Sequence, residues 1–277
     1  MRKKLLFFVA LNLLMISCGR EGDVDERTLN FPREVDYVTK LPGKDNFWIF
    51  ILAGQSNMAG RGLVEPSDTV ASQRIYSIDS LGNWIFAKEP LHFYEPVRTG
   101  LDCGLSFGRE LKTRLGDSVF IGIVPCAIGG SSVEQWLGDS LYKGIKLYSN
   151  FREKAGLASE VGTIKGILWH QGETNAHENS FTDYEANLKA LFIKFRTEAK
   201  NDTLQILVGE LGPFLRRKEF DGYSDSVNNV LRILARDDPN ISLIETGDLK
   251  HKGDSLHFNS ESQRLLGKKF AEKLRIK

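Results

Sequence analysis

The sequence predicts a single three-layer α/β/α domain built around a five-stranded parallel sheet. Five short runs rich in β-branched and aromatic residues predict the strands, at 47–53, 118–124, 164–169, 204–210 and 241–246. Continuous apolar runs of this kind are typical of strands that are buried on both faces of a sheet. Helical patterns lie between several of them, and alternation of strand and helix predicts parallel strands joined by right-handed crossovers.

The first predicted strand, 47–53, is followed by Gly54-Gln55-Ser56-Asn57-Met58. An apolar run bounded by a glycine indicates a strand that ends in a tight turn. Open α/β sheets place their ligand crevices at the carboxyl ends of the strands. Ser56 is therefore expected at that edge, exposed enough to act as a nucleophile. The alternative interpretation is that Ser56 only caps the segment that follows.

The stretch 63–103 separates the first strand from the next helix and contains Pro66, Pro90 and Pro96. We expect it to be irregular and to run near the active face, where loops carry specificity. A short helix is predicted over 105–115. After the second strand, Gly129-Gly130-Ser131 allows a bare backbone amide to approach a ligand closely.

Three longer helices are predicted in the second half of the chain. The first spans 181–200, where apolar residues share one helix face, which indicates core packing: Tyr184, Leu188, Leu191, Phe192, Phe195 and Ala199. The other two span 223–236 and 261–276. Ser260 is a suitable N-cap for the last of them.

Asp254-Ser255-Leu256-His257 precedes the final helix and supplies a base for Ser56. A histidine can accept the serine proton, and an aspartate can hold the imidazole in the required tautomer. A spacing of three residues lets both side chains come from one short loop. Asp254 has an alternative interpretation as a turn residue after Gly253.

Four other histidines compete with His257 for the role of base: His92, His170, His177 and His251. His251 is the strongest of them, because Asp248 precedes it at the same spacing. Lys250, Lys252 and Gly253 flank it, however, which indicates a solvated loop. An amphipathic helix follows His257, so the sequence favours His257.

Four blocks of this chain together resemble the SGNH (GDSL-like) hydrolase superfamily, most closely its acetylxylan esterase and sialate O-acetylesterase branch. The resemblance covers roughly 45–277. The blocks occur in the family's order: Gly54-Gln55-Ser56-Asn57-Met58-Ala59-Gly60-Arg61-Gly62, Pro125-Cys126-Ala127-Ile128-Gly129-Gly130-Ser131-Ser132, Trp169-His170-Gln171-Gly172-Glu173 and Asp254-Ser255-Leu256-His257. The resemblance implies a flavodoxin-like strand order, 2-1-3-4-5.

A tetrahedral intermediate requires hydrogen-bond donors directed at its oxyanion. The expected donors are the backbone N–H of Ser56, the backbone N–H of Gly130 and the side-chain amide of Gln171, with Gly129 as the alternative to Gly130. The resemblance supports Gln171, because the acetylesterase branch has glutamine in this block where the wider superfamily has asparagine.

Three further side chains near these motifs have less specific interpretations. Glu173 and Arg61 are charged residues within motifs of small or apolar residues, and such charges are usually paired. We interpret both as bracing the serine loop from behind. Trp136 is expected either to line an acyl or sugar pocket or to pack in the core.

The resemblance implies a serine esterase that removes O-acetyl groups from carbohydrate through an acetyl-enzyme, without a cofactor. Acetylated xylan is the first expected substrate and sialate esters are the second. Two other functions remain open: a lipase or thioesterase of the same superfamily, and a glycan-binding lipoprotein with a decayed site. No His, Cys or Asp spacing indicates a metal site, and Cys103 and Cys126 are expected to be unpaired thiols.

The N-terminus predicts export from the cytoplasm. Arg2, Lys3 and Lys4 precede an apolar run that is shorter than the roughly 20 residues of a transmembrane helix. Met15-Ile16-Ser17-Cys18 resembles a bacterial lipobox, which implies lipidation of Cys18; the alternative is a plain secretory signal. We therefore expect a signal peptide at 1–17, a tether at 18–44, an esterase domain at 45–277 and a lipid anchor in the cell envelope, periplasmic or at the cell surface.

The charge of the chain argues against nucleic acid as a partner. The chain has 37 basic and 36 acidic residues, and removal of 1–17 leaves 34 basic residues. No basic stripe remains, so nucleic-acid binding has no electrostatic footprint. The sequence indicates no oligomeric state, and its only expected contact with a membrane is the lipid anchor.

Overall fold

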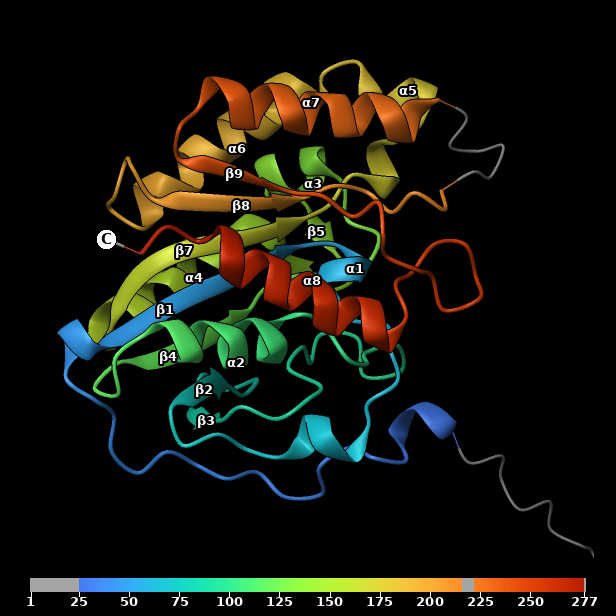
Figure 1. Ribbon diagram of the computed structural model, residues 1–277. Helices are drawn as coiled ribbons and strands as arrows, with labels where there is room; N and C mark the ends of the chain where they lie inside the picture. Colours follow the sequence, from blue (N-terminus) through green and yellow to red (C-terminus); the bar gives the residue numbers. More distant parts are fainter. Residues whose placement is uncertain (1–24, 216–221, 277) are drawn as a thin grey trace, which may run out of the picture.

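The computed structural model describes residues 25–215 and 222–276, and it is built around a seven-stranded sheet (Figure 1). The strand order is β3-β2-β4-β1-β7-β8-β9, and all neighbours are parallel except the antiparallel pair β2–β3. The strands span Phe47–Gly54 (β1), Ile75–Ile78 (β2), Trp84–Phe86 (β3), Phe120–Pro125 (β4), Thr163–His170 (β7), Gln205–Gly209 (β8) and Ile241–Ile244 (β9).

The five predicted strands are β1, β4, β7, β8 and β9, and their order across the sheet is the expected 2-1-3-4-5. The predicted α/β/α fold is therefore confirmed. The count of five strands is too low, because β2 and β3 come from the stretch 63–103 that was expected to be irregular. Both are only three or four residues long, and β2 is completed by pairing with β4, more than forty residues away in the chain.

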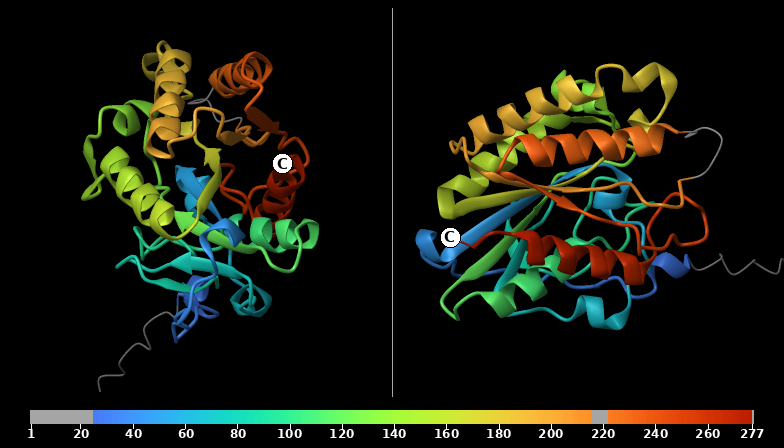
Figure 2. Two further views of the ribbon diagram at one scale, coloured as in Figure 1. Left: turned by 90° about the vertical axis from the view of Figure 1, so that its left-hand side faces the viewer. Right: turned by 45° about the horizontal axis from the view of Figure 1, so that its top comes forward.

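Helices cover both faces of the sheet (Figure 2). One face packs against α2 (Gly104–Arg114) and α8 (Ser260–Lys273). The other packs against α3 (Val133–Leu137), α4 (Leu147–Val161), α6 (Tyr184–Glu198) and α7 (Tyr223–Asp237). Strand β1 contributes alternately to the two cores, with Ile49 and Ile51 on the α4 side and Phe50 and Leu52 on the α2 side. This alternation is why its whole sequence is apolar.

Several local boundaries differ from the sequence prediction. The predicted helix 181–200 is divided into α5 (Glu178–Phe181) and α6, because Asp183 has a non-helical backbone. Helix α4 was not predicted. The last helix is capped by Asn259, whose side chain accepts from the backbone N–H of Ser262, so the predicted cap Ser260 is instead the first helical residue. Two short elements complete the fold: α1 (Ser56–Ala59) and the hairpin of β5 (Leu141–Tyr142) and β6 (Ile145–Lys146).

The segment 25–44 lies against the domain, which corrects the expectation of a tether reaching to residue 44. The backbone N–H of Val38 donates to the carbonyl of Trp84, and the N–H of Phe86 donates to the carbonyl of Asp36. The predicted signal peptide and Cys18 lie outside the described residues. Within 25–215 and 222–276, no helix combines the length and apolar character needed to span a bilayer.

Cys103 and Cys126 are buried and unpaired, as expected. They belong to the cores on opposite faces of the sheet. Burial raises the pKa of both thiols, which makes the reactive thiolate harder to form.

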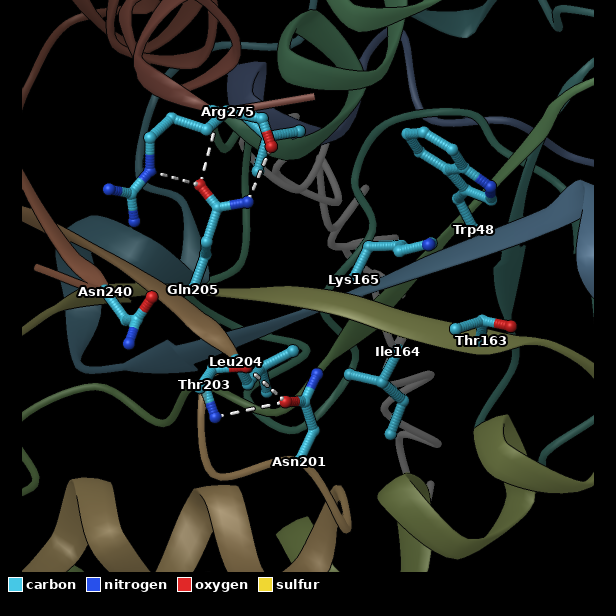
Figure 3. Close-up of a pocket in the computed structure, with 11 residues that line it drawn as sticks. Trp48, Thr163, Ile164, Lys165, Asn201, Thr203, Leu204, Gln205, Asn240 and Arg275 are labelled. Carbon is cyan, nitrogen blue, oxygen red and sulfur yellow. Dashed lines mark hydrogen bonds between the residues drawn. The ribbon is translucent and has the colours of Figure 1, made fainter. Parts of the chain in front are cut away.

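Figure 3 shows a pocket that is lined by residues at the amino ends of the strands, whereas Ser56 follows the carboxyl end of β1. Trp48, Lys165 and Gln205 line it from three strands, and the Lys165 ammonium lies 4.6 Å from the Trp48 ring centroid. The Gln205 side chain exchanges hydrogen bonds with the backbone of Arg275 at 2.7 and 2.9 Å. These contacts fasten the end of the chain to the sheet.

Candidate active site

Ser56 begins α1 directly after β1, and the turn between them requires glycine. Gly54 has φ +138°, and a Cβ atom at this position would lie 2.1 Å from the carbonyl oxygen of His170. Only glycine permits this backbone and this approach. Ser56 is thus held at the carboxyl edge of the sheet, with 7% of its surface exposed.

The structure brings Ser56, His257 and Asp254 into one hydrogen-bonded chain. His257 Nε2 lies 3.1 Å from Ser56 Oγ, and His257 Nδ1 lies 2.7 Å from Asp254 Oδ2. The other carboxylate oxygen of Asp254 accepts from the backbone N–H groups of Leu256 and His257 at 3.0 and 2.8 Å. A carboxylate can only accept, so the proton of neutral His257 is on Nδ1 and Nε2 is free to accept the serine proton.

The electrostatics of this chain suit a base that operates near neutrality. Burial raises the pKa of Asp254, but hydrogen bonds from the backbone and ring of His257 and from Leu256 outweigh it and lower the pKa to about 2. Burial lowers the pKa of His257 below its ordinary 6.5, against the opposing attraction of Asp254. Asp254 is therefore ionised and His257 is neutral at pH 7.

His251 supports the loop that carries Asp254 and His257, and its flanking residues Lys250, Lys252 and Gly253 are exposed, as expected of a solvated loop. Its Nδ1 accepts from the backbone N–H groups of Gly253 and Ser255, both at 3.0 Å. Among the remaining histidines, His92 pairs with Asp102 in the interior, His170 bonds to the carbonyl of Glu210, and His177 lines the cavity above Ser56.

Asn57 joins the serine loop to the histidine loop, a role that the sequence analysis missed. Its Nδ2 donates to Glu173 Oε1 at 2.5 Å and to the carbonyl of Leu256 at 3.1 Å, and its Oδ1 accepts from the N–H of Phe258 at 3.0 Å. The side chain is fully buried. A polar asparagine directly after Ser56 was the available signal, because a buried side-chain amide usually has hydrogen-bond partners. Glu173 therefore supports this loop through Asn57.

Arg61 is paired with Glu95, a second residue that the sequence analysis missed. Arg61 Nη2 lies 2.6 Å from Glu95 Oε2, which also accepts from the backbone N–H of Gly129 at 2.7 Å. Lys143, from the β5–β6 hairpin, lies 2.6 Å from Glu95 Oε1. Glu95 thus ties three segments together around the cavity. It lies in the proline-containing stretch 63–103, where no periodicity marks a functional position.

The two glycines after β4 differ in what their amides can do. The N–H of Gly129 is occupied by Glu95. The N–H groups of Gly130 and Ser56 have no acceptor among the described residues. Gly130 has φ +78° and lines the cavity. Of the two glycines, the geometry therefore leaves the amide of Gly130 available to a ligand.

Gln171 lies behind the cavity wall and is fully buried. Its Nε2 donates to the carbonyl of Ser131 at 3.2 Å and to Asn175 Oδ1 at 2.7 Å. Both amide hydrogens therefore have acceptors within the protein, which is at odds with the predicted presentation of this amide to a reacting ester. Trp136 is also fully buried and donates to Ser131 Oγ, so core packing describes it best.

An open cavity lies above Ser56 at the carboxyl edge of the sheet. Its wall combines the two loops of the hydrogen-bonded chain with the glycine loop, the β5–β6 hairpin and the loop after β7. The lining residues are Gln55, Ser56, Arg61, Arg98, Gly129, Gly130, Tyr142, Lys143, Glu173, Thr174, His177, Leu256 and His257. Most of these residues carry polar or charged side chains that could contact a hydroxyl-rich ligand.

An α/β sheet with this site at its carboxyl edge defines a hydrolase, and comparison with known proteins shows a carboxylic ester hydrolase. A family model described as carbohydrate esterase, sialic acid-specific acetylesterase, matches residues 46–275, and the chain belongs to this family. The resemblance predicted from the four sequence blocks is confirmed.

Individual relatives agree with this assignment. The chain is 31% identical over 245 residues to a probable carbohydrate esterase of Arabidopsis thaliana. The aligned region covers 81% of this chain and 88% of the relative. The crystal structure of a protein from that Arabidopsis locus superimposes with a TM-score of 0.71 at 29% identity, covering 82% and 97% of the two chains. A carbohydrate acetylesterase from Xanthomonas citri has the same fold at 20% identity, with a TM-score of 0.58 and coverage of 82% and 55%.

Proposed function

We propose that this protein hydrolyses O-acetyl groups on carbohydrate, with Ser56 as nucleophile, His257 as general base and Asp254 as the residue that orients His257. The observation that carries the proposal is the hydrogen-bonded chain Ser56–His257–Asp254 at an open cavity. The family assignment supports carbohydrate esters as the substrate class.

In the proposed reaction, His257 Nε2 takes the Ser56 proton as Oγ attacks the acetyl carbonyl carbon. The tetrahedral oxyanion faces the free N–H groups of Ser56 and Gly130. The C–O bond to the sugar then breaks, and His257 returns the proton to the sugar oxygen. Water, deprotonated by the same histidine, attacks the acetyl-enzyme and releases acetate and free Ser56.

Within this class, sialate O-acetyl esters are favoured over acetylated xylan by the charge of the cavity. Arg61, Arg98 and Lys143 line it, and Glu95 lies beside two of them. Arg98 is exposed at the cavity and has no carboxylate partner among the described residues. A guanidinium in this position suits the carboxylate of an acidic sugar, whereas xylan backbone sugars carry no such group.

Acetate release across a panel of acetylated glycans tests the substrate. O-acetylated sialate is expected to have the highest kcat/KM, and Arg98→Gln is expected to raise its KM by about threefold to tenfold, since exposed charge pairs are weak. The effect should shrink with added salt. Arg236→Gln removes a positive charge from α7, away from the cavity, and is the matched control. Preference for acetylated xylan, or an equal change in KM in Arg98→Gln and Arg236→Gln, would indicate a neutral substrate. Activity that increases with the length of the acyl chain would favour a lipase or thioesterase.

The acid limb of the pH profile is expected below pH 6.5. Only neutral His257 can accept the serine proton, and burial lowers the pKa of this histidine from 6.5, so kcat/KM should fall only when the pH drops through that lowered value. The Glu173 carboxylate raises the His257 pKa. Glu173→Gln should therefore move the limb to still lower pH, while keeping an acceptor for Asn57. The measurement is kcat/KM from pH 4 to 9 for both proteins; a limb above 6.5, or an upward shift in the variant, contradicts the assignment.

The cellular location stays a prediction from the N-terminal sequence. Export and lipidation of Cys18 would place the esterase domain in the cell envelope, where it would meet extracellular or periplasmic glycans.

A further inference from the structure

We infer that Lys143 and Tyr142 are positioning residues, which hold the peptide between Gly129 and Gly130 so that the Gly130 N–H faces the reacting ester. Both residues come from the β5–β6 hairpin, a part of the cavity wall that takes no direct part in the proposed reaction. The inference rests on the proposed function, because it concerns the intermediate formed when Ser56 attacks an ester.

The glycines after β4 lie in a tight turn whose central peptide could point in two directions. The N–H of Ser131 donates to the carbonyl of Ile128 at 3.3 Å, which closes a turn with Gly129 and Gly130 at its centre. Gly130 has φ +78°, as in a type II turn, whereas a type I turn has a negative φ at this position and its central peptide turned over. Two successive glycines impose little steric preference between these turns. Contacts with other segments must therefore select the observed orientation.

The hairpin holds the carbonyl end of this peptide. Lys143 Nζ donates to the Gly129 carbonyl oxygen at 2.6 Å, and the Tyr142 hydroxyl donates to the same oxygen at 3.3 Å. A Cβ atom on Gly130 would lie 2.8 Å from the Tyr142 hydroxyl oxygen, so this approach requires glycine. The C=O and N–H of a planar trans peptide point in opposite directions. Fixing the Gly129 carbonyl therefore directs the Gly130 N–H away from these two donors, where no described residue accepts from it.

Glu95 fixes the amide end of Gly129 and holds Lys143 in place. Its Oε2 accepts from the Gly129 N–H at 2.7 Å, and its Oε1 lies 2.6 Å from Lys143 Nζ. Burial raises the pKa of Glu95, but the hydrogen bond from Lys143 and the charge of Arg61 outweigh it and lower the pKa below its ordinary value. One ionised carboxylate thus orients the N–H of Gly129 and, through Lys143, the carbonyl of the same residue.

The backbone of the hairpin favours a role for the Lys143 side chain. Lys143 and Gly144 form the loop between β5 and β6, with φ +49° and +81°. Such loops favour asparagine, aspartate or glycine at the first position, because other residues rarely adopt a positive φ. Contacts of the Lys143 side chain offset this unfavourable backbone, and those contacts are with Glu95 and Gly129.

If the peptide turned over, the Gly129 carbonyl oxygen would replace the Gly130 N–H at the reacting ester. The oxyanion would then face an acceptor instead of a donor, and the stabilisation of the transition state would fall. Binding of the uncharged ester would change little, because the oxyanion forms only as the reaction proceeds. Loss of the hairpin contacts should therefore lower kcat more than it changes KM.

The test uses nitrophenyl acetate, a substrate that needs no sugar recognition. Lys143→Met removes the ammonium at similar size and is expected to lower kcat by about tenfold to 10²-fold, with KM changed by less than about threefold. Tyr142→Phe removes the second donor without a change in charge, and a loss in kcat of about threefold is expected. Lys146→Met is the matched control and should behave as the parent, because it removes an exposed ammonium of the same hairpin that does not bond to Glu95 or Gly129.

Two further measurements separate the orientation of the peptide from the charge of the cavity. The loss in Lys143→Met should persist at high salt, which screens the effect of a distant charge but not a local contact. Reaction with a fluorophosphonate, whose phosphonyl oxygen takes negative charge as Ser56 attacks, should slow in parallel with kcat. The melting temperature of Lys143→Met should stay near that of the parent, because the Lys143 side chain is 37% exposed.

The inference is overturned if Lys143→Met keeps kcat and the phosphonylation rate within about twofold of the parent. A change confined to KM also overturns it, because Lys143 would then be a substrate contact. Should Lys143→Met fail to fold, Tyr142→Phe decides, and an unchanged kcat overturns the inference. If Ser56→Ala remains active, the proposed nucleophile is wrong and the inference falls with it. If Ser56→Ala is inactive while Lys143→Met matches the parent, only the inference fails.

Discussion

Ser56→Ala is expected to abolish acetate release, with a loss in kcat of about 10⁴-fold or more. The variant retains the cavity, His257 and the free amides but has no atom that can form the acyl-enzyme. Ser56 Oγ hydrogen-bonds to His257 Nε2 at 3.1 Å. Removing the hydroxyl therefore costs one contact and should leave the melting temperature within a few degrees of the parent's. The measurements are acetate release, fluorophosphonate labelling and thermal unfolding of the purified protein.

Ser67→Ala is the matched control, because Ser67 is an exposed serine in the short helical turn Pro66–Thr69. It should keep full activity and labelling. If Ser56→Ala retained more than about 1% of the parent kcat, against the loss expected for a triad member, Ser56 would not be the nucleophile. If the parent protein neither labels nor releases acetate from any substrate in the panel, the interpretation as a glycan-binding protein with a decayed site replaces the enzyme.

His257→Ala is expected to be about as damaging as Ser56→Ala, because without the imidazole the hydroxyl of Ser56 has no base. The double variant should be no worse than either single variant, since residues that act as one unit do not add. His251→Ala is the comparison at the rival histidine. It removes the acceptor for two backbone N–H groups of the same loop, and a loss of about tenfold or less is expected from a weakened loop.

The measurement is kcat and KM for the two single variants, the double variant and His251→Ala. A double variant far less active than each single variant would mean that Ser56 and His257 act separately. If His251→Ala lost as much activity as His257→Ala, either His251 would be the base or the substitution would have disrupted the whole loop. Thermal unfolding of His251→Ala distinguishes these two explanations.

The elements that sequence analysis identified share one property: each carries its own local signal. The strand Phe47–Gly54 is apolar throughout because both of its faces are buried. The nucleophile motif follows that strand directly, and Asp254 and His257 lie three residues apart. Parallel strands place their carboxyl ends at one edge, so residues 201 positions apart, Ser56 and His257, were expected to meet, and they lie 3.1 Å apart.

The features that the sequence analysis missed depend on contacts between segments that are distant in the chain. Strand β2 is a strand because Ile75–Ser77 pair with Ile121–Ile123, and segment 25–44 docks because Trp84 and Phe86 offer it backbone partners. Neither partner is visible from the short segment itself. Glu95 is likewise one acidic residue among 36 in the sequence. Its connection of Arg61, Gly129 and Lys143 exists only in the folded protein.

The sequence by itself determined the five strands β1, β4, β7, β8 and β9 of the sheet, the location of the site at its carboxyl edge and the residue types that gather there. The apolar runs of the strands and the short Asp254–His257 spacing are local properties of the chain, so they can be read without coordinates. Only the tertiary structure decided which of two glutamines faces the cavity and which of two adjacent glycines has a free amide. The reason is that a donor is available only if no neighbour accepts from it: Asn175 and Ser131 occupy the Gln171 amide, and Glu95 occupies the Gly129 N–H.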